Sequence, residues 1–324
     1  MGKMLTREQI EHYRREGYVV VERLLEPDTL AELRRVTDEV VASASGLTDH
    51  TKVLDLEPSH TPEHPRVRRI KSPHLAHPFY WDMAGHPPVM AALEPLIGRD
   101  IRVRAGGKVN LKSPGYGAPV EWHQDWAFYP HTNDDVLAVG ILLDDMDEGN
   151  GPMMVLPRSH LGPIYDHHAD GAFCGGIDLA RTPLDLSDAV ALTAPAGSVT
   201  IHHARLVHGS AVNRSERPRR LLFFEYAAAD AWPLAGTEPL DDLDEFNRRV
   251  VHGKPTLEPR LAPAPVRIPL PKAVYQGSLY ENQRTLGYRY FATAEEPERG
   301  QGQETESAPG RESGRERAAV AAAD

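Results

Sequence analysis

The positions of apolar and polar residues along the chain predict a helix first and a strand directly after it. Thr6 and Gln9 form a capping box that begins a short helix to about Glu16, and Gly17 ends it. Residues 18–21, Tyr-Val-Val-Val, are apolar and mostly β-branched, which favours a strand. The chain therefore begins with a helix and a strand that follow each other closely.

Two more helices are predicted before residue 100. Apolar residues recur at near-helical spacing from Pro27 to about Val40 and again around residues 89–97. Between these helices, residues 42–81 are rich in Pro, His, Ser and Thr, so we expect mostly loop. A basic run at 66–71 lies inside this loop, where it either stays in solvent or contacts an anionic group of a substrate.

Beyond residue 100 the periodicity changes to that of short strands, separated by turns rich in Gly, Pro, Asn and Asp. Helices followed by many short strands predict an α+β or sandwich layout, and a jelly roll of two antiparallel sheets fits best. We assign the N-terminal helices and loop to residues 5–100 and the strand-rich core to residues 101–230. The predicted core strands are 101–104, 108–112, 137–143, 153–156, 198–202 and 219–227.

The C-terminal part of the chain divides into an extension and a tail. Residues 231–293 are punctuated by proline and contain a late aromatic cluster, whose members either pack on the core or line the mouth of a pocket. Residues 294–324 are polar and aperiodic, which predicts disorder. We therefore expect a single domain, residues 1–293, followed by a disordered tail.

Composition and charge argue against several classes of partner. The formal net charge of −11 is unfavourable for binding nucleic acid or an anionic membrane, and no stretch has the roughly 20 apolar residues of a membrane span. Cys174 is the only cysteine, so we expect no disulfide framework and a reducing, cytoplasmic location. Any metal site must then be built from nitrogen and oxygen ligands. The sequence indicates no oligomeric state.

The first candidate for chemistry is residues 121–125, Glu-Trp-His-Gln-Asp. Side chains two apart on an extended strand point to the same face, so His123 and Asp125 can bind one metal ion. His208, far downstream, is the best candidate for a third ligand. Two histidines and one carboxylate on one face of an ion form the facial triad of non-haem iron oxygenases, which leaves positions open for a co-substrate and dioxygen.

The chain has 16 histidines, and one pair competes directly with the chosen one. His168 and Asp170 have the same spacing as His123 and Asp125. They lie, however, in a polar, glycine-bounded run without strand alternation, where nothing holds them on a rigid element. Precise ligand geometry is better supported at His123, beside a strand-like region.

His202 and His203 compete with His208 for the place of the second histidine. A dicarboxylic co-substrate requires a cation for its far carboxylate, and the planar guanidinium of arginine suits this role. Arg219 begins the apolar strand that follows His208 across a turn, whereas Arg214, at the same spacing from His203, lies in a polar turn. The pair of His208 and Arg219 is therefore preferred.

Several motifs occur in a fixed order along most of residues 5–230. They are an N-terminal signature at 13–21, Trp-His-Gln-Asp-Trp at 122–126, Gly-Asn-Gly-Pro-Met-Met-Val-Leu-Pro-Arg-Ser-His at 149–160, Gly-Ser-Val at 197–199, His-Gly-Ser at 208–210, and Arg219. Together they resemble the phytanoyl-CoA dioxygenase-like family of iron(II)/2-oxoglutarate oxygenases. One departure is Arg158, which stands where many members have glycine and bears on the shape of the substrate side.

The resemblance implies an α+β fold with a mainly β core, a double-stranded β-helix of the jelly-roll or cupin-like kind with N-terminal helices packed on the barrel. It implies that His123, Asp125 and His208 bind iron(II). It also implies that 2-oxoglutarate chelates the metal and is converted with O2 to succinate and carbon dioxide, while an unactivated C–H bond of a small organic substrate is hydroxylated. Because related halogenases lack the carboxylate ligand, Asp125 disfavours halogenation.

The same resemblance assigns the co-substrate contacts. Arg219 and Ser210 are expected to hold the far carboxylate of 2-oxoglutarate, and Asn110 to contact the co-substrate. Family members act on acyl-CoA esters, amino acids, phosphonates or natural-product scaffolds, and the sequence selects none of these. Candidate substrate contacts, cationic or aromatic, are Arg69, Lys71, Trp126, Phe128, Tyr129 and Trp232.

Two other functions remain open at this point. Two histidines and an aspartate also hold zinc in metal-dependent hydrolases, where the metal activates water. Alternatively, a jelly roll that keeps these residues without activity serves as a binding module, because a fold does not fix a function. Metal analysis distinguishes the hydrolase, and turnover distinguishes the binding module.

Overall fold

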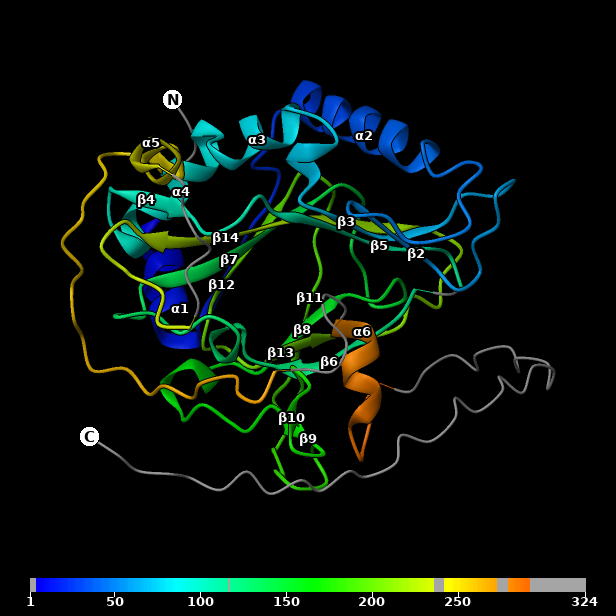
Figure 1. The fold of residues 1–324 in the computed structure, drawn as a ribbon. Coiled ribbons are helices and arrows are strands. Elements are labelled where there is room, and N and C mark those ends of the chain that lie inside the picture. The colour runs from blue at the N-terminus through cyan, green and yellow to red at the C-terminus, as the bar shows by residue number, and fades with distance from the viewer. Residues whose placement is uncertain (1–3, 116, 236–241, 273–278, 292–324) are drawn as a thin grey trace, which may run out of the picture. The chain divides into compact units, whose positions relative to one another are not determined.

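The computed structural model describes residues 4–115, 117–235, 242–272 and 279–291, and two antiparallel sheets dominate it (Figure 1). The strands of the larger sheet in these residues are β1 (Tyr18–Val21), β2 (Leu54–Leu56), β3 (Val67–Lys71), β4 (Ile101–Val103), β5 (Lys108–Lys112), β7 (Val136–Leu142), β12 (Val199–His203), β14 (Arg219–Ala228) and β15 (Val250–His252). Their order is β1-β12-β7-β14-β5-β3-β2, with β4 paired to β14 and β15 paired to β4.

The smaller sheet carries the other motifs. Its strands are β6 (Val120–His123), β8 (Met153–Val155), β11 (Val190–Leu192) and β13 (His208–Ser210), in the order β11-β8-β13-β6. A separate hairpin pairs β9 (His168–Ala169) with β10 (Ala172–Phe173). The smaller sheet faces the larger one (Figure 1), which confirms the predicted jelly roll with a mainly β core.

Helices cover the larger sheet on its outer side (Figure 1). The helices of the described residues are α1 (Arg7–Glu16), α2 (Pro27–Ala42), α3 (Phe79–Ala84), α4 (Pro87–Ile97), α5 (Leu243–Arg248) and α6 (Leu279–Asn282), with 3₁₀-helices η1 (Pro73–Leu75), η2 (Asp125–Ala127), η3 (Ser159–Leu161) and η4 (Gln283–Thr285). The predicted capping box of α1 is confirmed: Thr6 Oγ1 accepts a hydrogen bond from Gln9 N, and Thr6 N donates to Gln9 Oε1. Gly17 ends the helix in a left-handed conformation, with φ of 86°.

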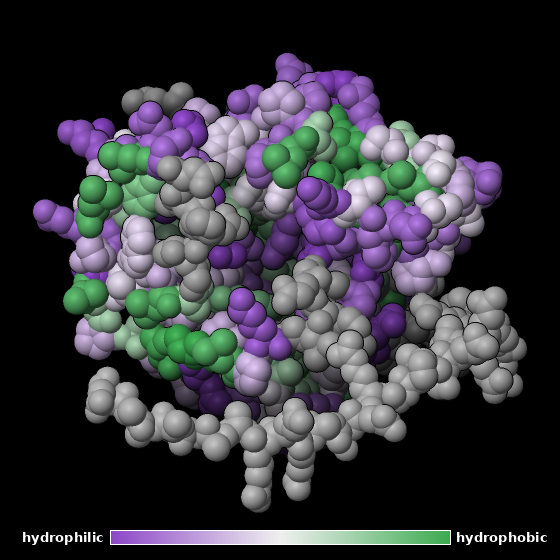
Figure 2. Space-filling model, viewed as in Figure 1, coloured by the Kyte–Doolittle hydropathy of each residue, from purple (hydrophilic) through white to green (hydrophobic). Residues whose placement is uncertain are grey.

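The main core lies between these helices and the outer face of the larger sheet. Leu33 and Val36 of α2 are fully buried in the same apolar cluster as Val109 of β5 and Leu222 of β14. Because strand side chains alternate between faces, the neighbours of these strand residues point to the inner side, toward the smaller sheet. The inner side is hollowed, and hydrophilic side chains line the hollow (Figure 2).

Residues 42–81 are mostly loop, as predicted, but the prediction missed two strands and a helix in this segment. Strands β2 and β3 add two members to the larger sheet, and α3 follows them. Most of the basic run forms strand β3, and its cations form ion pairs with carboxylates of other segments. Arg69 pairs with Asp55 of β2 at 2.6 Å, and Arg68 pairs with Glu281 of α6 at 2.6 Å. These ion pairs let a charged segment take up a buried strand position.

The other elements mostly follow the sequence. The helices predicted around 27–40 and 89–97 and the six predicted core strands are confirmed, whereas β11 and β15 were not predicted. All described residues belong to one compact unit, Met1–Ala294, and the tail predicted from residue 294 lies outside the described residues. In the part of the chain that the structure describes, no helix has the length and apolar character to cross a membrane.

Candidate metal centre

The pairing of β6 with β13 brings the two candidate histidines together. His123 and His208 are directly opposite each other in the register of this antiparallel pair. Opposed residues on adjacent strands project from the same face, and the two imidazole centroids lie 4.1 Å apart. Residues far apart in sequence are thus held side by side by backbone hydrogen bonds rather than by flexible loops.

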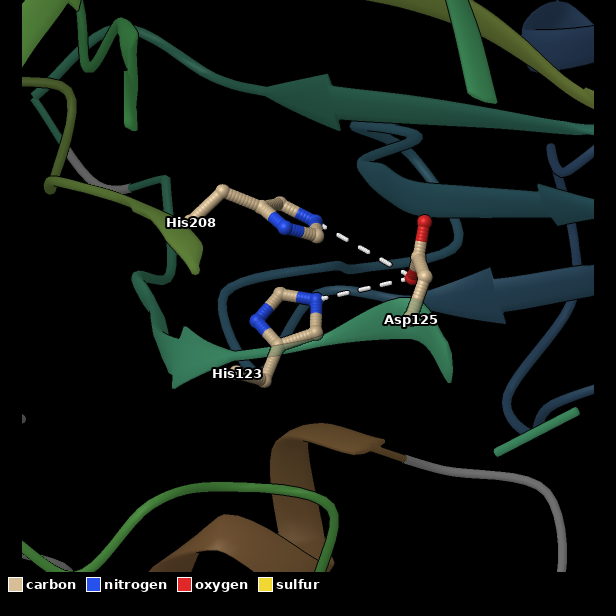
Figure 3. A group of neighbouring side chains, drawn as sticks. All are labelled: His123, Asp125 and His208. Carbon is tan, nitrogen blue, oxygen red and sulfur yellow. Dashed lines mark ion pairs between the residues drawn. The ribbon is translucent and has the colours of Figure 1, made fainter. Parts of the chain in front are cut away.

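Asp125 joins the histidines from the start of a 3₁₀-helix. Strand β6 ends at His123, so the expectation that His123 and Asp125 share a strand is wrong. The intervening Gln124 is nevertheless extended, with φ of −121° and ψ of 126°, which keeps the two side chains on one side. Asp125 Oδ1 lies 3.9 Å from Nε2 of His123 and 3.9 Å from Nε2 of His208 (Figure 3).

Backbone carbonyl groups orient both imidazoles toward a shared space. Nδ1 of His123 donates to the carbonyl oxygen of Glu121 at 2.8 Å, and Nδ1 of His208 donates to that of Leu206 at 2.9 Å. A carbonyl oxygen only accepts, so the proton of each ring lies on Nδ1 and the lone pair lies on Nε2. One ligand atom from each of the three residues lies within 4.8 Å of the others, a spacing that fits a metal ion.

The electrostatics suit a divalent cation. Burial lowers the pKa of His123 and holds that of His208 well below its ordinary value, which keeps both rings neutral. Burial raises the pKa of Asp125, but His208 and His202 outweigh it, so the pKa of this carboxyl lies well below its usual range. Neutral imidazoles and an ionised carboxylate are the protonation states that metal binding requires.

Strands β5 and β14 of the larger sheet face the metal centre across a cavity of about 70 Å³. On β5 every second residue lines this cavity, namely Lys108, Asn110 and Lys112, while Val109 and Leu111 enter the core behind. The cavity is also lined by His123, Asp125, His202, His208, Ser210, Arg219, Leu221, Phe223, Glu225, Arg69, Leu279 and Tyr280. A metal centre of neutral and anionic ligands thus faces a wall rich in cations.

Two of these cations lie directly opposite each other. Arg219 and Lys112 are paired in the register of β14 with β5, and each is only 2% exposed. Lys112 Nζ donates to Ser210 Oγ at 2.9 Å and to the carbonyl oxygen of Ala211, while the Arg219 guanidinium donates to the carbonyl oxygen of Gly151 at 2.8 and 3.0 Å. In the described residues neither forms an ion pair with a carboxylate.

This pair is unfavourable by itself. Burial holds the pKa of Lys112 well below its ordinary value, helped by the nearby charge of Arg219, and burial lowers the pKa of Arg219 to about 10. Like charges directly opposite on adjacent strands destabilise a sheet. An anion bound between Lys112 and Arg219 relieves this repulsion, so the pair is suited to a carboxylate.

Most of the predicted substrate contacts lie elsewhere. Arg69, which pairs with Asp55, lines the cavity. Lys71 pairs with the same carboxylate at 2.8 Å but does not line the cavity. Helix η2 turns the chain away, so the indole of Trp126 donates to the carbonyl oxygen of Pro265 at 2.7 Å. The three other aromatic residues do not line the cavity either: Phe128 lies edge-on to His123, Tyr129 packs beneath Arg104, and Trp232 packs on Phe246.

Several residues of the site were missed by sequence reasoning. The alternation Lys-Val-Asn-Leu-Lys in β5 was the available signal for Lys108 and Lys112, because a strand with one charged face needs a polar space to point into. His202, a rejected ligand, instead lies with Nε2 3.4 Å from Asp125 Oδ2. Tyr280 belongs to the late aromatic cluster, for which lining the mouth of a pocket was one of two interpretations, and it lines the cavity from the C-terminal segment.

The competing pair does not form a metal site. His168 lies on β9, where no strand was predicted, and its Nδ1 is 2.7 Å from Asp166 Oδ1. Asp170, at the turn after β9, has a positive φ of 51°. Among the described residues, His123, Asp125 and His208 are the one group of three or more potential ligands whose atoms converge.

Comparison with known proteins agrees with this geometry. The sequence profile of the phytanoyl-CoA dioxygenase (PhyH) family matches residues 13–221. A probable alpha-ketoglutarate-dependent hypophosphite dioxygenase of Stutzerimonas stutzeri is 37% identical over 288 residues, which cover 88% of this chain and 99% of that protein. An ectoine dioxygenase of Bordetella parapertussis is 27% identical over 248 residues, covering 68% of this chain and 75% of that protein.

Solved structures show the same fold. The non-haem alpha-ketoglutarate-dependent carbocyclase SnoK from nogalamycin biosynthesis superposes with a TM-score of 0.59 at 25% identity, covering 74% of this chain and 94% of that chain. EctD from S. alaskensis with bound Fe superposes with a TM-score of 0.60 at 22% identity, covering 80% of this chain and 88% of that chain. The arrangement of the two sheets therefore has counterparts in solved structures.

Proposed function

The chain belongs to the phytanoyl-CoA dioxygenase family, and from this premise we propose the roles of its site residues and the class of its substrate. The enzyme is an iron(II)- and 2-oxoglutarate-dependent dioxygenase that acts on a small molecule, as its relatives are. The hydrolase and the binding module are set aside on this ground. We also propose that it works in the cytoplasm, because its one cysteine, Cys174, is a free thiol.

His123, Asp125 and His208 hold the iron. Their donor set, two neutral nitrogens and one carboxylate oxygen on one side of a shared space, supports this assignment. His202 orients the carboxylate, since its Nε2 approaches Asp125 Oδ2 and leaves Oδ1 directed at the two histidines. Bound iron with 2-oxoglutarate supplies the oxidising chemistry, while the protein orients the reactants and excludes water.

Lys112, Arg219 and Ser210 hold the far carboxylate of 2-oxoglutarate. The observation that carries this proposal is the opposed Lys112 and Arg219 pair, two buried cations whose hydrogen bonds reach only hydroxyl and carbonyl oxygens among the described residues. A carboxylate placed there receives charge-assisted hydrogen bonds from both side chains. Asn110 lines the cavity two residues before Lys112 on β5 and is the further candidate contact.

The substrate end of the cavity is formed by Lys108 and Arg69. Lys108 Nζ is neutralised by Glu225 Oε1 at 3.0 Å. Arg69 and Lys71 both form ion pairs with Asp55, at 2.6 and 2.8 Å, and of these two cations Arg69 lines the cavity. The cavity is lined by four cations, Arg69, Lys108, Lys112 and Arg219, and by two carboxylates, Asp125 and Glu225, so it favours an anion.

We therefore propose a small oxyanion as substrate, with hypophosphite as the leading candidate. Its support is the similarity to the hypophosphite dioxygenase over 99% of that protein together with the cation-rich cavity. Hydroxylation would then convert a P–H bond to P–OH and yield phosphite, succinate and carbon dioxide from hypophosphite, 2-oxoglutarate and O2. This differs from the C–H hydroxylation that the sequence led us to expect.

The test is turnover of the iron(II)-loaded enzyme with hypophosphite, ectoine or L-proline, with phosphite followed by ³¹P NMR and succinate by chromatography. Of the three compounds, we expect only hypophosphite to be turned over, with phosphite and succinate formed in equal amounts. Arg69→Met should raise the KM for hypophosphite about tenfold, as expected for loss of a charged contact, while Lys71→Met should change it little. Succinate formed without phosphite would refute the substrate and leave the co-substrate assignment intact.

A further inference from the structure

The C-terminal residues 279–291, which we term the strap, pack against the strand that carries His123. Gln283 is buried, and its Oε1 accepts a hydrogen bond from Glu121 N at 2.9 Å. In return, Glu121 Oε2 accepts from the backbone N–H groups of Tyr290 and Phe291, at 2.9 and 3.3 Å. The strap is therefore hydrogen-bonded to both the backbone and the side chain of Glu121, which lies two positions before His123.

The strap also contacts the strand that carries His208. The ring of Phe291 lies against Trp122, with centroids 5.3 Å apart, and covers Gly209. A Cβ atom on Gly209 would come within 2.7 Å of Phe291 Cε2, so the glycine permits this close approach. Because Trp122 and Gly209 each neighbour a proposed iron ligand, the strap braces both ligand strands at once.

The other end of the strap reaches the larger sheet. Glu281 Oε1 lies 2.6 Å from Nη2 of Arg68, which is on β3 and only 4% exposed. The same guanidinium stands over the ring of Tyr280, 4.9 Å from its centroid. Figure 1 shows α6, the start of the strap, beside β6 of the smaller sheet. The strap thus joins the two sheets of the jelly roll.

Tyr280 of the strap reaches the co-substrate end of the cavity. Its side chain lines the cavity together with Arg219, Lys112 and Ser210. Burial lowers the pKa of Arg219, and Tyr280 acts on it in the opposite direction, which places the phenol within electrostatic reach of the guanidinium. A phenol hydroxyl there can donate to an oxygen of a bound carboxylate.

We propose that Tyr280 is a co-substrate-binding residue, whose hydroxyl donates a hydrogen bond to the far carboxylate of 2-oxoglutarate beside Arg219, and that the ion pair of Arg68 with Glu281 positions it. The proposal rests on the function assigned above. By linkage, a strap that contacts 2-oxoglutarate only when docked is itself held in place by 2-oxoglutarate. We therefore expect bound 2-oxoglutarate to reduce local opening of the docked strap.

Tyr280→Phe tests the hydroxyl alone, because phenylalanine keeps the ring that packs on Arg68. Tyr288→Phe is the matched control, since Tyr288 is in the same strap but is 50% exposed. Anaerobic titration of the iron(II) proteins with 2-oxoglutarate, followed by the charge-transfer absorption of the chelated keto acid, gives each Kd. We expect Tyr280→Phe to raise the Kd about tenfold and Tyr288→Phe to leave it unchanged.

Hydrogen–deuterium exchange of the strap supplies a readout that is independent of turnover. In the anaerobic iron(II) wild type, 2-oxoglutarate should slow amide exchange in residues 279–291. Glu281→Gln should weaken this protection, whereas Glu258→Gln, an exposed control, should retain it. Absence of the absorption band in wild type would overturn the proposed function itself. A normal band with a wild-type Kd for Tyr280→Phe, or no slowing of strap exchange, would overturn the strap proposal alone.

Discussion

Replacing Lys112 with methionine tests separately how its buried charge affects the stability of the protein and how it affects the affinity for 2-oxoglutarate. Lys112 is 2% exposed, and burial together with Arg219 holds its pKa well below its ordinary value. Methionine keeps most of the chain length and removes the charge. Because the penalty of burying a cation beside Arg219 disappears, we expect the Lys112→Met protein, free of co-substrate, to be at least as stable as wild type.

The pH dependence of stability gives the sign of this effect. The folded-state pKa of Lys112 lies below the unfolded value of 10.5, so the unfolded chain binds the proton more readily. Wild-type stability should therefore rise with pH between these two values. The Lys112→Met protein should lose this contribution, which is measured by thermal unfolding across the alkaline range.

The affinity of Lys112→Met for 2-oxoglutarate should fall, although its stability is retained or raised. A hydrogen bond to a charged group contributes about 1.5–3 kcal/mol, and about 1.4 kcal/mol corresponds to a tenfold change in Kd. Lys112→Met should therefore raise the Kd for 2-oxoglutarate about 10- to 100-fold in the anaerobic titration. Stability and affinity would then move apart, which a purely structural lysine cannot produce.

Lys108→Met is the matched control, because Lys108 lies on the same strand and face. Its Nζ pairs with Glu225 at 3.0 Å, and Glu225 is 7% exposed. Removing this cation leaves a buried carboxylate with a weaker partner, so stability should fall while the Kd for 2-oxoglutarate stays near that of wild type. If Lys112→Met is destabilised as Lys108→Met is and binds 2-oxoglutarate normally, the carboxylate site lies elsewhere.

Two further predictions concern histidines. His123→Ala or Asp125→Ala should abolish iron retention in metal analysis after desalting, whereas His168→Ala should retain iron; the reverse would mean that the wrong triplet was chosen. Burial lowers the pKa of His167 to about 3, and its Nε2 accepts from Gln124 N at 2.8 Å, so its contribution to stability is present above the unfolded pKa of 6.5 and is lost as pH falls toward 3. Urea unfolding between pH 7 and 5 should show a loss of up to about 1.4 kcal/mol per pH unit from this residue, reduced in His167→Gln; an equal loss in both proteins would refute the reasoning.

Local sequence signals predicted those elements whose causes are local. The capping box at Thr6 and the glycine at position 17 set the ends of α1 by contacts within the helix itself. The strand β3 was mistaken for loop because its charged residues hide the alternation of a strand. Their neutralisation depends on Asp55 and Glu281, and the second of these lies far away in the sequence. The strand conformation of that segment therefore depends on its tertiary partners.

The convergence of His123, Asp125 and His208 could be predicted because metal binding restricts the residue types and their spacing, and their motifs are close to strands. The substrate wall could not, since Trp126 follows the ligands directly but points to Pro265 once η2 turns the chain. Aromatic residues near a motif are as suited to packing as to binding. The sequence could not decide whether Tyr280 packs on the core or lines the pocket, because its place at the cavity depends on the strap crossing between the sheets.

Charge placed where it costs stability is the clearest mark of function in this fold. The inner face of β5 presents Lys108, Asn110 and Lys112 where a jelly roll ordinarily packs apolar side chains. Lys108 is compensated within the protein by Glu225, so its charge is satisfied before any ligand arrives. Lys112 faces Arg219 instead, and only an anion from outside completes that pair. The distinction between a compensated and an uncompensated cation on one strand is therefore our ground for proposing that Lys112, and not Lys108, recognises the co-substrate.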